Sequence, residues 1–161
     1  MSTKAIYPGT FDPITYGHIN ILEKASRLFD KVILGVAAYT EKETLFSLQE
    51  RYKLCLESVK HLSNVEVYTF EGLAVDFAHS QNCTVMLRGL RAVSDFEYEL
   101  SLALTNTTLN PQIETVFLVP SLRYMYLSSS ITRQLAELDS ELKDFVPPVV
   151  AKALREKFKK E

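Results

Sequence analysis

The chain has 161 residues, of which 47% are apolar and 24% charged, and its formal net charge is −2 at pH 7. This length and composition suit one globular domain, residues 1–161, with a core of its own, and argue against two domains. The small negative charge argues against a sequence-independent nucleic-acid binder, which normally carries a basic excess.

The sequence also argues against a membrane protein and against functional cysteines. No apolar segment approaches the roughly 18 residues that a membrane-spanning helix needs, and the first residues lack the apolar stretch of a secretion signal. We therefore expect a cytoplasmic protein that binds no membrane. Cys55 and Cys83 lie far apart, without the CxxC or histidine spacing of a zinc site, so we expect reduced and inert thiols.

Strands and helices alternate along the predicted chain. Apolar runs predict strands at residues 4–7, 32–38, 65–69, 84–88 and 115–120. Helical spacing predicts a helix of about a dozen residues that opens near His18 and ends before Asp30, followed by helices at 48–62, 73–81, 93–109, 131–138 and 149–160. This order predicts an α/β fold, a single-domain, Rossmann-like, five-stranded parallel sheet flanked by helices.

The long helix predicted at 93–109 has two apolar sides. The side expected to face the core contains Phe96, Leu100, Ala103 and Leu104. The second side is only partly apolar and contains Tyr98, Leu102, Thr105 and Leu109. Such a helix could also face a partner subunit.

The segment YPGTFDPITYGH, residues 7–18, connects the first strand to the first helix. A helix that begins after such a loop offers unpaired N–H groups and the positive end of its dipole, which suit an anion such as phosphate. Gly17 would let a ligand approach the backbone, and His18 would add a hydrogen-bond donor. The segment therefore predicts a phosphate site that contains a histidine.

Other strand-to-helix loops are expected to lie beside this one. Right-handed crossovers place these loops at one edge of a parallel sheet, and ligands bind there where the strand order reverses. The candidate groups on these loops are Thr10, His18, Lys42, Arg88, Arg91 and the triplet Ser128, Ser129 and Ser130. We expect all of them to face one pocket.

Each of these groups also has an ordinary structural explanation. Arg88 and Arg91 suit bidentate contacts with phosphate, but they could instead pair with Asp95, Glu97 or Glu99. Glu99 itself could accept a hydrogen bond from a base or ribose, although a helical glutamate more often lies at the surface.

Lys42 and the serine triplet are equally ambiguous in isolation. Lys42 lies between Glu41 and Glu43, as in a solvated run of charges, although its place after the second strand favours a role in the site. One serine of 128–130 is needed as a helix N-cap. The other hydroxyl and N–H groups could hold the β- and γ-phosphates of a nucleotide.

Other phosphate-binding motifs are missing from the sequence. It contains no GxxxxGK[ST] and no GxGxxG, which argues against a P-loop ATPase and a dinucleotide oxidoreductase. HExxH and the serine nucleophile elbow are also missing, so metalloprotease and serine-hydrolase chemistry are not indicated.

The motifs resemble those of a known family. Residues 15–18, TYGH, resemble the (H/T)xGH signature of the nucleotidyltransferase superfamily. Together with RGLRAVSDFEYE at 88–99 and the serine triplet, they resemble bacterial phosphopantetheine adenylyltransferases over essentially the whole chain. The resemblance implies transfer of AMP from ATP to 4′-phosphopantetheine, which yields dephospho-coenzyme A and pyrophosphate. It also implies a cytoplasmic homohexamer that uses Mg²⁺, held mainly by phosphates and water.

The resemblance also assigns site residues. Those implied for ATP are Thr10, Phe11, His18, Gly89, Leu90, Arg91, Glu99, Tyr124, Met125, Tyr126, Leu127, Ser128, Ser129 and Ser130. Those implied for phosphopantetheine are Thr10, Lys42, Ala74 and Arg88. Two positions depart from frequent family choices, a larger aliphatic residue at Ala74 and tryptophan at Tyr124, so we expect altered affinity and the same reaction.

The residue types suit direct in-line displacement. A phosphate monoester is already ionised at neutral pH, so no general base is required, and we expect His18, Thr10 and Lys42 to stabilise the transition state. Another transferase with this signature, acting on nicotinamide mononucleotide or glycerol phosphate, is an alternative. A non-catalytic nucleotide sensor is a second alternative, but it gives no reason for His18 and Lys42 to accompany a triphosphate site.

Overall fold

The computed structural model describes residues 2–91 and 93–159, and the side chains of residues 93–95 are outside this description. The strands are β1 (Lys4–Gly9), β2 (Lys31–Ala37), β3 (Val65–Phe70), β4 (Val85–Gly89) and β5 (Glu114–Leu118). The helices are α1 (Tyr16–Leu28), α2 (Leu48–Val59), α3 (Ala74–Ser80), α4 (Val93–Leu109), the 3₁₀ helix η1 (Leu122–Tyr124), α5 (Ser129–Glu137) and α6 (Pro148–Lys157). The predicted alternation of strands and helices is confirmed.

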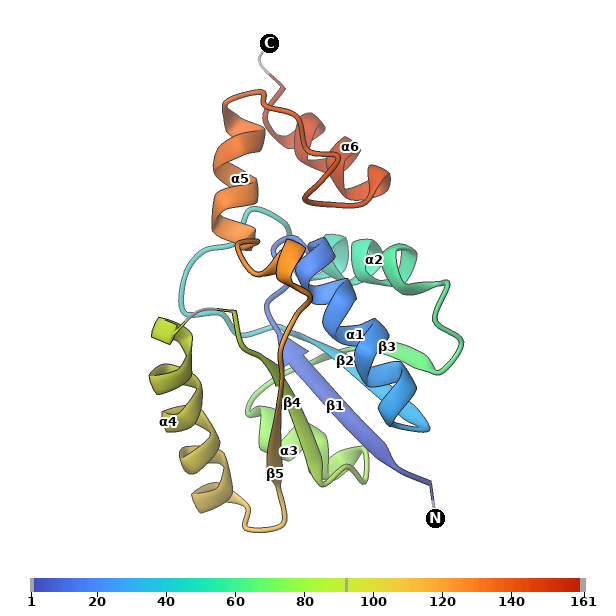
Figure 1. The fold of residues 1–161 in the computed structure, drawn as a ribbon, viewed down its shortest axis with the longest axis vertical. Helices are drawn as coiled ribbons and strands as arrows, with labels where there is room; N and C mark the ends of the chain where they lie inside the picture. The colour runs from blue at the N-terminus through green and yellow to red at the C-terminus, as the bar shows by residue number, and fades with distance from the viewer. Residues whose placement is uncertain (1, 92, 160–161) are drawn as a thin grey trace.

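The sheet is parallel, with the strand order β3-β2-β1-β4-β5 (Figure 1). From β1 the chain first proceeds to β2 and β3 on one side, and later to β4 and β5 on the other. Strand order therefore reverses between β1 and β4, where Ile6 is paired with Met86. Loops that leave neighbouring strands in opposite directions leave an opening at their carboxyl ends, where ligands bind in such folds.

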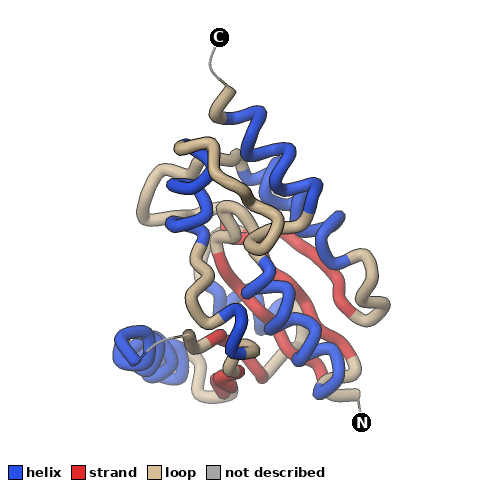
Figure 2. Tube along the Cα trace, turned by 45° about the horizontal axis from the view of Figure 1, so that its top comes forward, coloured by secondary structure: helices blue, strands red, loops and turns tan. Residues whose placement is uncertain are grey.

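Alternate residues of the strands pack on opposite faces of the sheet. Tyr7 and Leu34 belong to the larger core, which also contains Leu22 and Ala25 of α1. Ile6 and Ile33 belong to the smaller core, which includes Val75 and Ala78 of α3. Because successive strand residues point to opposite faces, the fully apolar runs in the sequence correspond to strands covered on both sides, as Figure 2 shows.

The start of α5 differs from the prediction. The helix begins at Ser129 rather than at 131, because Ser128 is its N-cap and its Oγ accepts from the N–H of Ile131 at 3.1 Å. Two of the three serines therefore lie in the first turn of the helix. The loop expected at 121–130 also contains η1.

The prediction that one apolar side of α4 faces the core is wrong for three residues. Phe96, Leu100 and Leu104 are 46%, 39% and 62% exposed. The side that approaches the sheet carries the polar residues Glu99 and Asn106, and the Nδ2 of Asn106 donates to the sulfur of Met86 at 3.4 Å. Glu99 and Asn106 thus bond to residues of β4, while the ring of Phe96 lies 6.2 Å from that of Phe117 on β5.

The last two helices lie beyond the carboxyl edge of the sheet, at the top of Figure 1. Val150 and Leu154 of α6 are fully buried in the larger core. The carbonyl of Phe145 accepts from the N–H of Tyr16 at 2.9 Å, so the C-terminal segment contacts the first turn of α1. Among the described residues, no helix is long and apolar enough to cross a bilayer.

Gly35 is a packing requirement of β2 that can be tested. A Cβ at this position would lie 2.9 Å from the ring of Phe77 and 3.2 Å from that of Phe70, and these two rings are stacked at 4.8 Å. We expect Gly35→Ala to lower the free energy of unfolding by about 1–3 kcal/mol because the core is overpacked. Urea denaturation measures this loss.

A second substitution separates this contact from a general effect of alanine. In a Phe77→Leu background the nearest ring atom is gone, so Gly35→Ala should cost less than it does in the wild-type background. An equal cost in the two backgrounds would show that the Phe77 ring is not what requires the glycine.

Candidate active site

A cavity of about 530 Å³ lies at the carboxyl ends of β1 and β4. Its lining comes from the loop after β1, the loop after β2, the end of β4 and the start of α5. The predicted site residues that line it are Thr10, Phe11, His18, Lys42, Arg88, Gly89, Arg91, Glu99, Leu127, Ser128, Ser129 and Ser130. The structure therefore brings the predicted loops together, while their contacts with ligands stay predictions.

Five predicted residues are not among those that line the cavity, namely Ala74, Leu90, Tyr124, Met125 and Tyr126. Ala74 begins α3 and packs against the smaller core. The N–H of Leu90 donates to the carbonyl of Leu118 at 2.9 Å and so prolongs the pairing of β4 with β5. The carbonyl of Tyr124 lies 3.8 Å from where a Cβ of Gly17 would be, which leaves residues 124–126 beside the first turn of α1.

His18 is held in one tautomer by the cap of α1. Its Nδ1 accepts from the N–H of Thr15 at 3.0 Å, and the Oγ1 of Thr15 accepts from the N–H of His18 at 3.5 Å. A neutral imidazole that accepts at Nδ1 carries its proton on Nε2. Burial, together with the charges of Arg91 and Arg88, lowers the pKa of His18 to about 4. At neutral pH the ring is therefore an uncharged donor at the cavity.

Phe11 supports the histidine ring. Its ring packs edge-on against His18 at 5.0 Å and against Tyr7 at 5.4 Å. Its φ of 52° lies in the left-handed region, which a bulky residue rarely adopts. Gly9 is needed below it, because a Cβ there would lie 3.0 Å from the Phe11 ring. Burial raises the pKa of Tyr7 to about 12, so this phenol stays protonated.

Arg88 pairs internally with Glu99, one of the partners that the sequence left open. Its Nε and Nη2 donate to the two carboxylate oxygens at 2.7 and 2.8 Å, and its Nη1 donates to the carbonyl of Pro8 at 3.0 Å. Burial acts to lower the pKa of Arg88, but the hydrogen bonds and charge of Glu99 raise it overall. Glu99 is 8% exposed, so it is not a surface glutamate. The side chain of Asp95, another partner considered, lies outside the described residues.

Arg88 retains capacity for a ligand despite this pairing. A guanidinium has five N–H groups, and three of those of Arg88 bond to described residues. Arg91 connects two of the predicted loops, since its Nη1 donates to the carbonyl of Leu127 at 2.7 Å. The two arginines thus reach the same cavity from the end of β4.

The three serines have three different hydrogen bonds. Ser128 caps α5, the hydroxyl of Ser129 donates to the carbonyl of Pro13 at 2.8 Å, and the Oγ of Ser130 accepts from Nη2 of Arg133 at 3.3 Å. The N–H groups of Ser129 and Ser130 donate to no other described group, as expected of the first residues of a helix. The positive end of α5 therefore faces the cavity with two donors.

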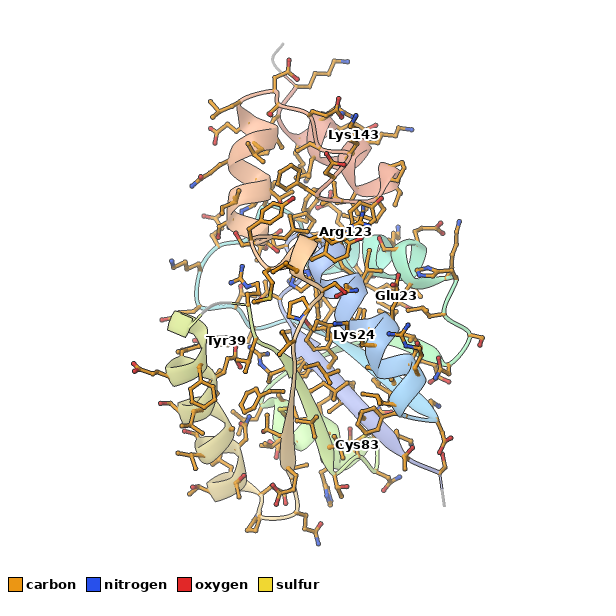
Figure 3. All side chains as sticks on the ribbon, in the orientation of Figure 1. Glu23, Lys24, Tyr39, Cys83, Arg123 and Lys143 are labelled. Carbon is orange, nitrogen blue, oxygen red and sulfur yellow. The ribbon has the colours of Figure 1, made fainter. Side chains whose placement is uncertain are left out.

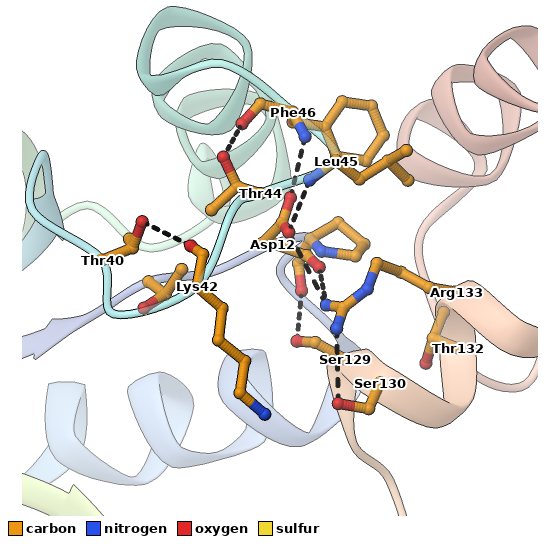
Figure 4. A network of polar contacts seen from close by, with 12 residues as sticks. Asp12, Thr40, Lys42, Thr44, Leu45, Phe46, Ser129, Ser130, Thr132 and Arg133 are labelled. Carbon is orange, nitrogen blue, oxygen red and sulfur yellow. Dashed lines mark hydrogen bonds and ion pairs between the residues drawn. The ribbon is translucent and has the colours of Figure 1, made fainter.

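Sequence reasoning missed four polar residues at the cavity. Asp12, Thr44 and Arg133 line it, and Arg51 bonds to the loops that form it. Figure 4 shows most of this group, with Arg133 of α5 reaching Asp12 in the loop after β1. The Nη1 of Arg133 lies 3.7 Å from Oδ2 of Asp12. The only available signal was the spacing of Ser130 and Arg133, which are neighbours on a helix. No sequence pattern connects Asp12 with residues more than a hundred positions away.

Potential metal ligands are not clustered. Among the described residues, no group of three or more histidine, cysteine, aspartate or glutamate side chains could hold an ion. Cys55 and Cys83 are both free and buried. Figure 3 shows the side chains over the whole fold and labels Cys83 near the lower end of the sheet, and Cys83 is not among the residues that line the cavity.

Comparisons with known proteins show the family of the chain. The cytidylyltransferase-like family matches residues 6–135. Phosphopantetheine adenylyltransferase from Methylacidiphilum infernorum is 52% identical over 159 residues, which cover 98% of this chain and 92% of that protein. The enzymes of the same name from Caldanaerobacter subterraneus and Staphylococcus haemolyticus are 51% and 50% identical, and the matches cover 97% and 98% of this chain and 98% of each relative. The chain belongs to the phosphopantetheine adenylyltransferase family.

More distant structures share the fold. Nicotinic acid mononucleotide adenylyltransferase from Plasmodium falciparum, solved with NaAD, matches with a TM-score of 0.70 and 18% identity over 97% of this chain and 96% of that one. A protein from Vibrio parahaemolyticus, provisionally assigned as a nicotinate-nucleotide adenylyltransferase, matches with a TM-score of 0.75 and 17% identity over 99% and 98%. At these identities the likeness shows the fold alone.

The protonation state of His18 is directly measurable. We expect ¹⁵N NMR to find the Nε2–H tautomer and a pKa near 4, because burial and the two arginines disfavour the imidazolium. In the unfolded chain the histidine titrates near 6.5, so between these values the unfolded state binds the extra proton. The contribution of His18 to stability is therefore complete above pH 6.5 and is lost as the pH falls towards 4.

His18→Gln is the matched variant for the stability measurement. Glutamine at this position can preserve the capping box with Thr15 but does not titrate. The free energy of unfolding of this variant should fall less between pH 6.5 and 4 than that of the wild type. Equal slopes, or an imidazole that titrates near 6.5, would contradict the buried neutral ring.

Proposed function

We propose that this chain transfers AMP from ATP to 4′-phosphopantetheine, yielding dephospho-coenzyme A and pyrophosphate. One observation carries the proposal, the meeting of Lys42, Arg88 and Arg91 with the neutral donor His18 in a single cavity. The identities of about 50% to enzymes of that name support the same substrates. The relatives named for nicotinate nucleotides are only 17–18% identical, which disfavours that alternative.

The reaction proposed is a direct displacement at the α-phosphorus. An oxygen of the phosphopantetheine phosphate, ionised at neutral pH, forms the new bond, and the bond from the α-phosphorus to the oxygen of the β-phosphate breaks. Pyrophosphate leaves with that electron pair, so no base on the protein and no covalent intermediate are required. Catalysis then consists of alignment and stabilisation of charge, which the donors around the cavity can provide.

We assign the donors to two groups of phosphates. The N–H groups of Ser129 and Ser130, with Arg91, suit the β- and γ-phosphates at the positive end of α5. Thr10 and Lys42 of the loops after β1 and β2, with Arg88 at the end of β4, suit the phosphate of phosphopantetheine. The Nε2–H of His18 lies between these groups in the proposed arrangement and donates to the α-phosphate.

Gly17 supports a close approach of ATP to the first turn of α1. A Cβ at this position would meet Thr15 and Leu127 only at 3.4 and 3.5 Å, which are ordinary contact distances. The packing of the protein therefore does not itself require glycine at this position. Room for a phosphate against the backbone is the remaining reason.

We propose that Mg²⁺ enters the site bound to the phosphates of ATP. Four carboxylates line the cavity, those of Asp12, Glu41, Glu43 and Glu99, but among the described residues they form no cluster that could hold an ion. The site therefore fits an ion that enters on the triphosphate and keeps waters as ligands. When bound, Mg²⁺ neutralises charge on the triphosphate. The chain holds the complex through the phosphates, by means of Arg91 and the start of α5.

The residues that do not line the cavity retain a proposed role at its edge. Tyr124, Met125 and Tyr126 lie beside α1, where the base of ATP would extend from the triphosphate. Ala74 and Leu90 would contact the substrates through main-chain atoms. We accordingly expect the departures at Ala74 and Tyr124 to alter affinity rather than the reaction.

The cytoplasmic homohexamer is also proposed rather than observed. The exposed apolar residues of α4, including Leu100 and Leu104, support a partner subunit on that helix. The formal net charge of −2 continues to argue against a nucleic-acid partner.

The activity is tested by mixing the protein with ATP, Mg²⁺ and 4′-phosphopantetheine and detecting dephospho-coenzyme A by mass spectrometry. We expect equal amounts of product and pyrophosphate. In competition at fixed ATP, nicotinamide mononucleotide and glycerol phosphate should not reduce the rate. Binding of ATP without release of pyrophosphate would support the nucleotide sensor instead.

His18→Ala tests the role of the histidine. We expect kcat to fall by about 10²–10³-fold, as for other lost transition-state donors, while the Kd for ATP changes by less than about threefold. Stopped-flow kinetics and calorimetry measure the two quantities. His61→Ala is the control, since His61 is an exposed histidine paired with Glu23 at 3.2 Å. A loss in ATP binding as large as the loss in kcat would refute the assigned role.

A further inference from the structure

Asp12 is a buried carboxylate whose two oxygens both bond to the main chain of another loop. It is 5% exposed, its Oδ2 accepts from the N–H of Leu45 at 2.9 Å, and its Oδ1 accepts from the N–H of Phe46 at 3.0 Å. Figure 4 shows these bonds crossing from the loop after β1 to the loop after β2. A carboxylate so occupied is poorly suited to accept a proton or hold a metal. Asp12 instead holds the carboxyl end of the loop after β2 in place.

Arg51 forms a second connection between the same loops. It is 2% exposed, and its Nε donates to the carbonyl of Phe46 at 3.3 Å. Its Nη1 donates both to the carbonyl of Thr10 at 2.8 Å and to that of Ala37 at 2.9 Å. Ala37 and Phe46 are the two ends of the loop that carries Lys42. Arg51 therefore fixes both ends of that loop and its distance from Thr10.

The two charged groups act on one short segment from opposite sides. Asp12 accepts from the N–H of Phe46, and Arg51 donates to the carbonyl of Phe46, so the peptide units on both sides of this residue are held. Burying charges is costly, and an apolar contact of the same volume would stabilise the fold equally well. Hydrogen bonds add a defined direction and distance that apolar contacts lack. Arg133, at 3.7 Å from Asp12, connects the start of α5 to the same carboxylate.

We propose that Asp12 and Arg51 are positioning residues that set the place of Lys42 relative to Thr10 and His18 across the cavity. The inference rests on the proposed function, because it assumes that Lys42 and Thr10 act on a transferred group. Asp12 lines the cavity, but both of its carboxylate oxygens accept from main-chain N–H groups, and Arg51 is not among the lining residues. Their effect on the reaction passes through the loop of residues 38–46, from which the Lys42 side chain extends away from the network (Figure 4).

A double-mutant cycle tests this coupling. Asp12→Asn preserves the volume but replaces one acceptor oxygen by an NH₂ group that faces a main-chain N–H. We expect kcat to fall by at least about tenfold, while KM for ATP changes by less than about threefold. The loop is displaced, but Arg133 of α5 keeps its hydrogen bond to the main-chain carbonyl of Asp12, so the start of α5 stays in place. In a Lys42→Met background the same substitution should lower kcat by less than about twofold.

Two controls separate positioning from lost stability. Val59→Ala removes the two γ-methyl groups of a core residue at the end of α2, where Val59 is 2% exposed. It should lower Tm without lowering kcat at a temperature where the protein is folded. Asp30→Asn alters another carboxylate that accepts from a main-chain N–H, that of Thr3 at 2.6 Å, at the opposite edge of the sheet. It should leave kcat unchanged.

The experiment distinguishes a failure of the positioning role from a failure of the proposed function. If the wild type forms dephospho-coenzyme A and the kcat losses of Asp12→Asn and Lys42→Met multiply, the positioning role is overturned and the function stands. If the wild type forms no product, the proposed function fails first. Should Asp12→Asn not fold, Arg51→Lys takes its place in the cycle, since one ammonium group cannot reproduce the planar donor set of Arg51, and the same criteria apply.

Discussion

The reversal of strand order between β1 and β4 is the constraint on which the site depends. A parallel sheet built by right-handed crossovers must send its connections to one edge, and only at a reversal do neighbouring loops separate far enough to leave an opening. Here the opening lies between the loop after β1 with the first turn of α1, which carry Thr10 and His18, and the end of β4, which carries Arg88. The helices on the two faces hold these strand ends in place by burial.

The charges of the site are set by local contacts, although the chain as a whole is slightly acidic. Arg88 is held by Glu99, and His18 is held neutral by its cap, by burial and by two nearby arginines. An uncharged donor can bind a phosphate without adding to the repulsion among the cations. The cavity therefore combines several positive groups with one neutral donor, an arrangement that a net charge of −2 neither predicts nor excludes.

The two kinds of relative provide different information. Those that are about half identical in sequence match over nearly the whole chain and show the family. Those below 20% identity share the sheet and its helices, since the folded core tolerates extensive apolar substitution when the pattern is retained. What such distant relatives bind depends on the loops, so the fold by itself does not choose between the substrates of these enzymes.

The sequence by itself determined the alternation of elements, the parallel sheet, the loops that meet at one edge and the family, because apolar periodicity and the TYGH and serine motifs are local patterns. It left open whether Arg88 pairs internally, and its assignment of Phe96, Leu100 and Leu104 to the core was wrong. Only the tertiary structure decided the Arg88–Glu99 pair and the bonds of Asp12 and Arg51 to distant loops. These contacts join residues far apart in the chain, and their hydrogen-bond geometry leaves no periodic trace in the sequence.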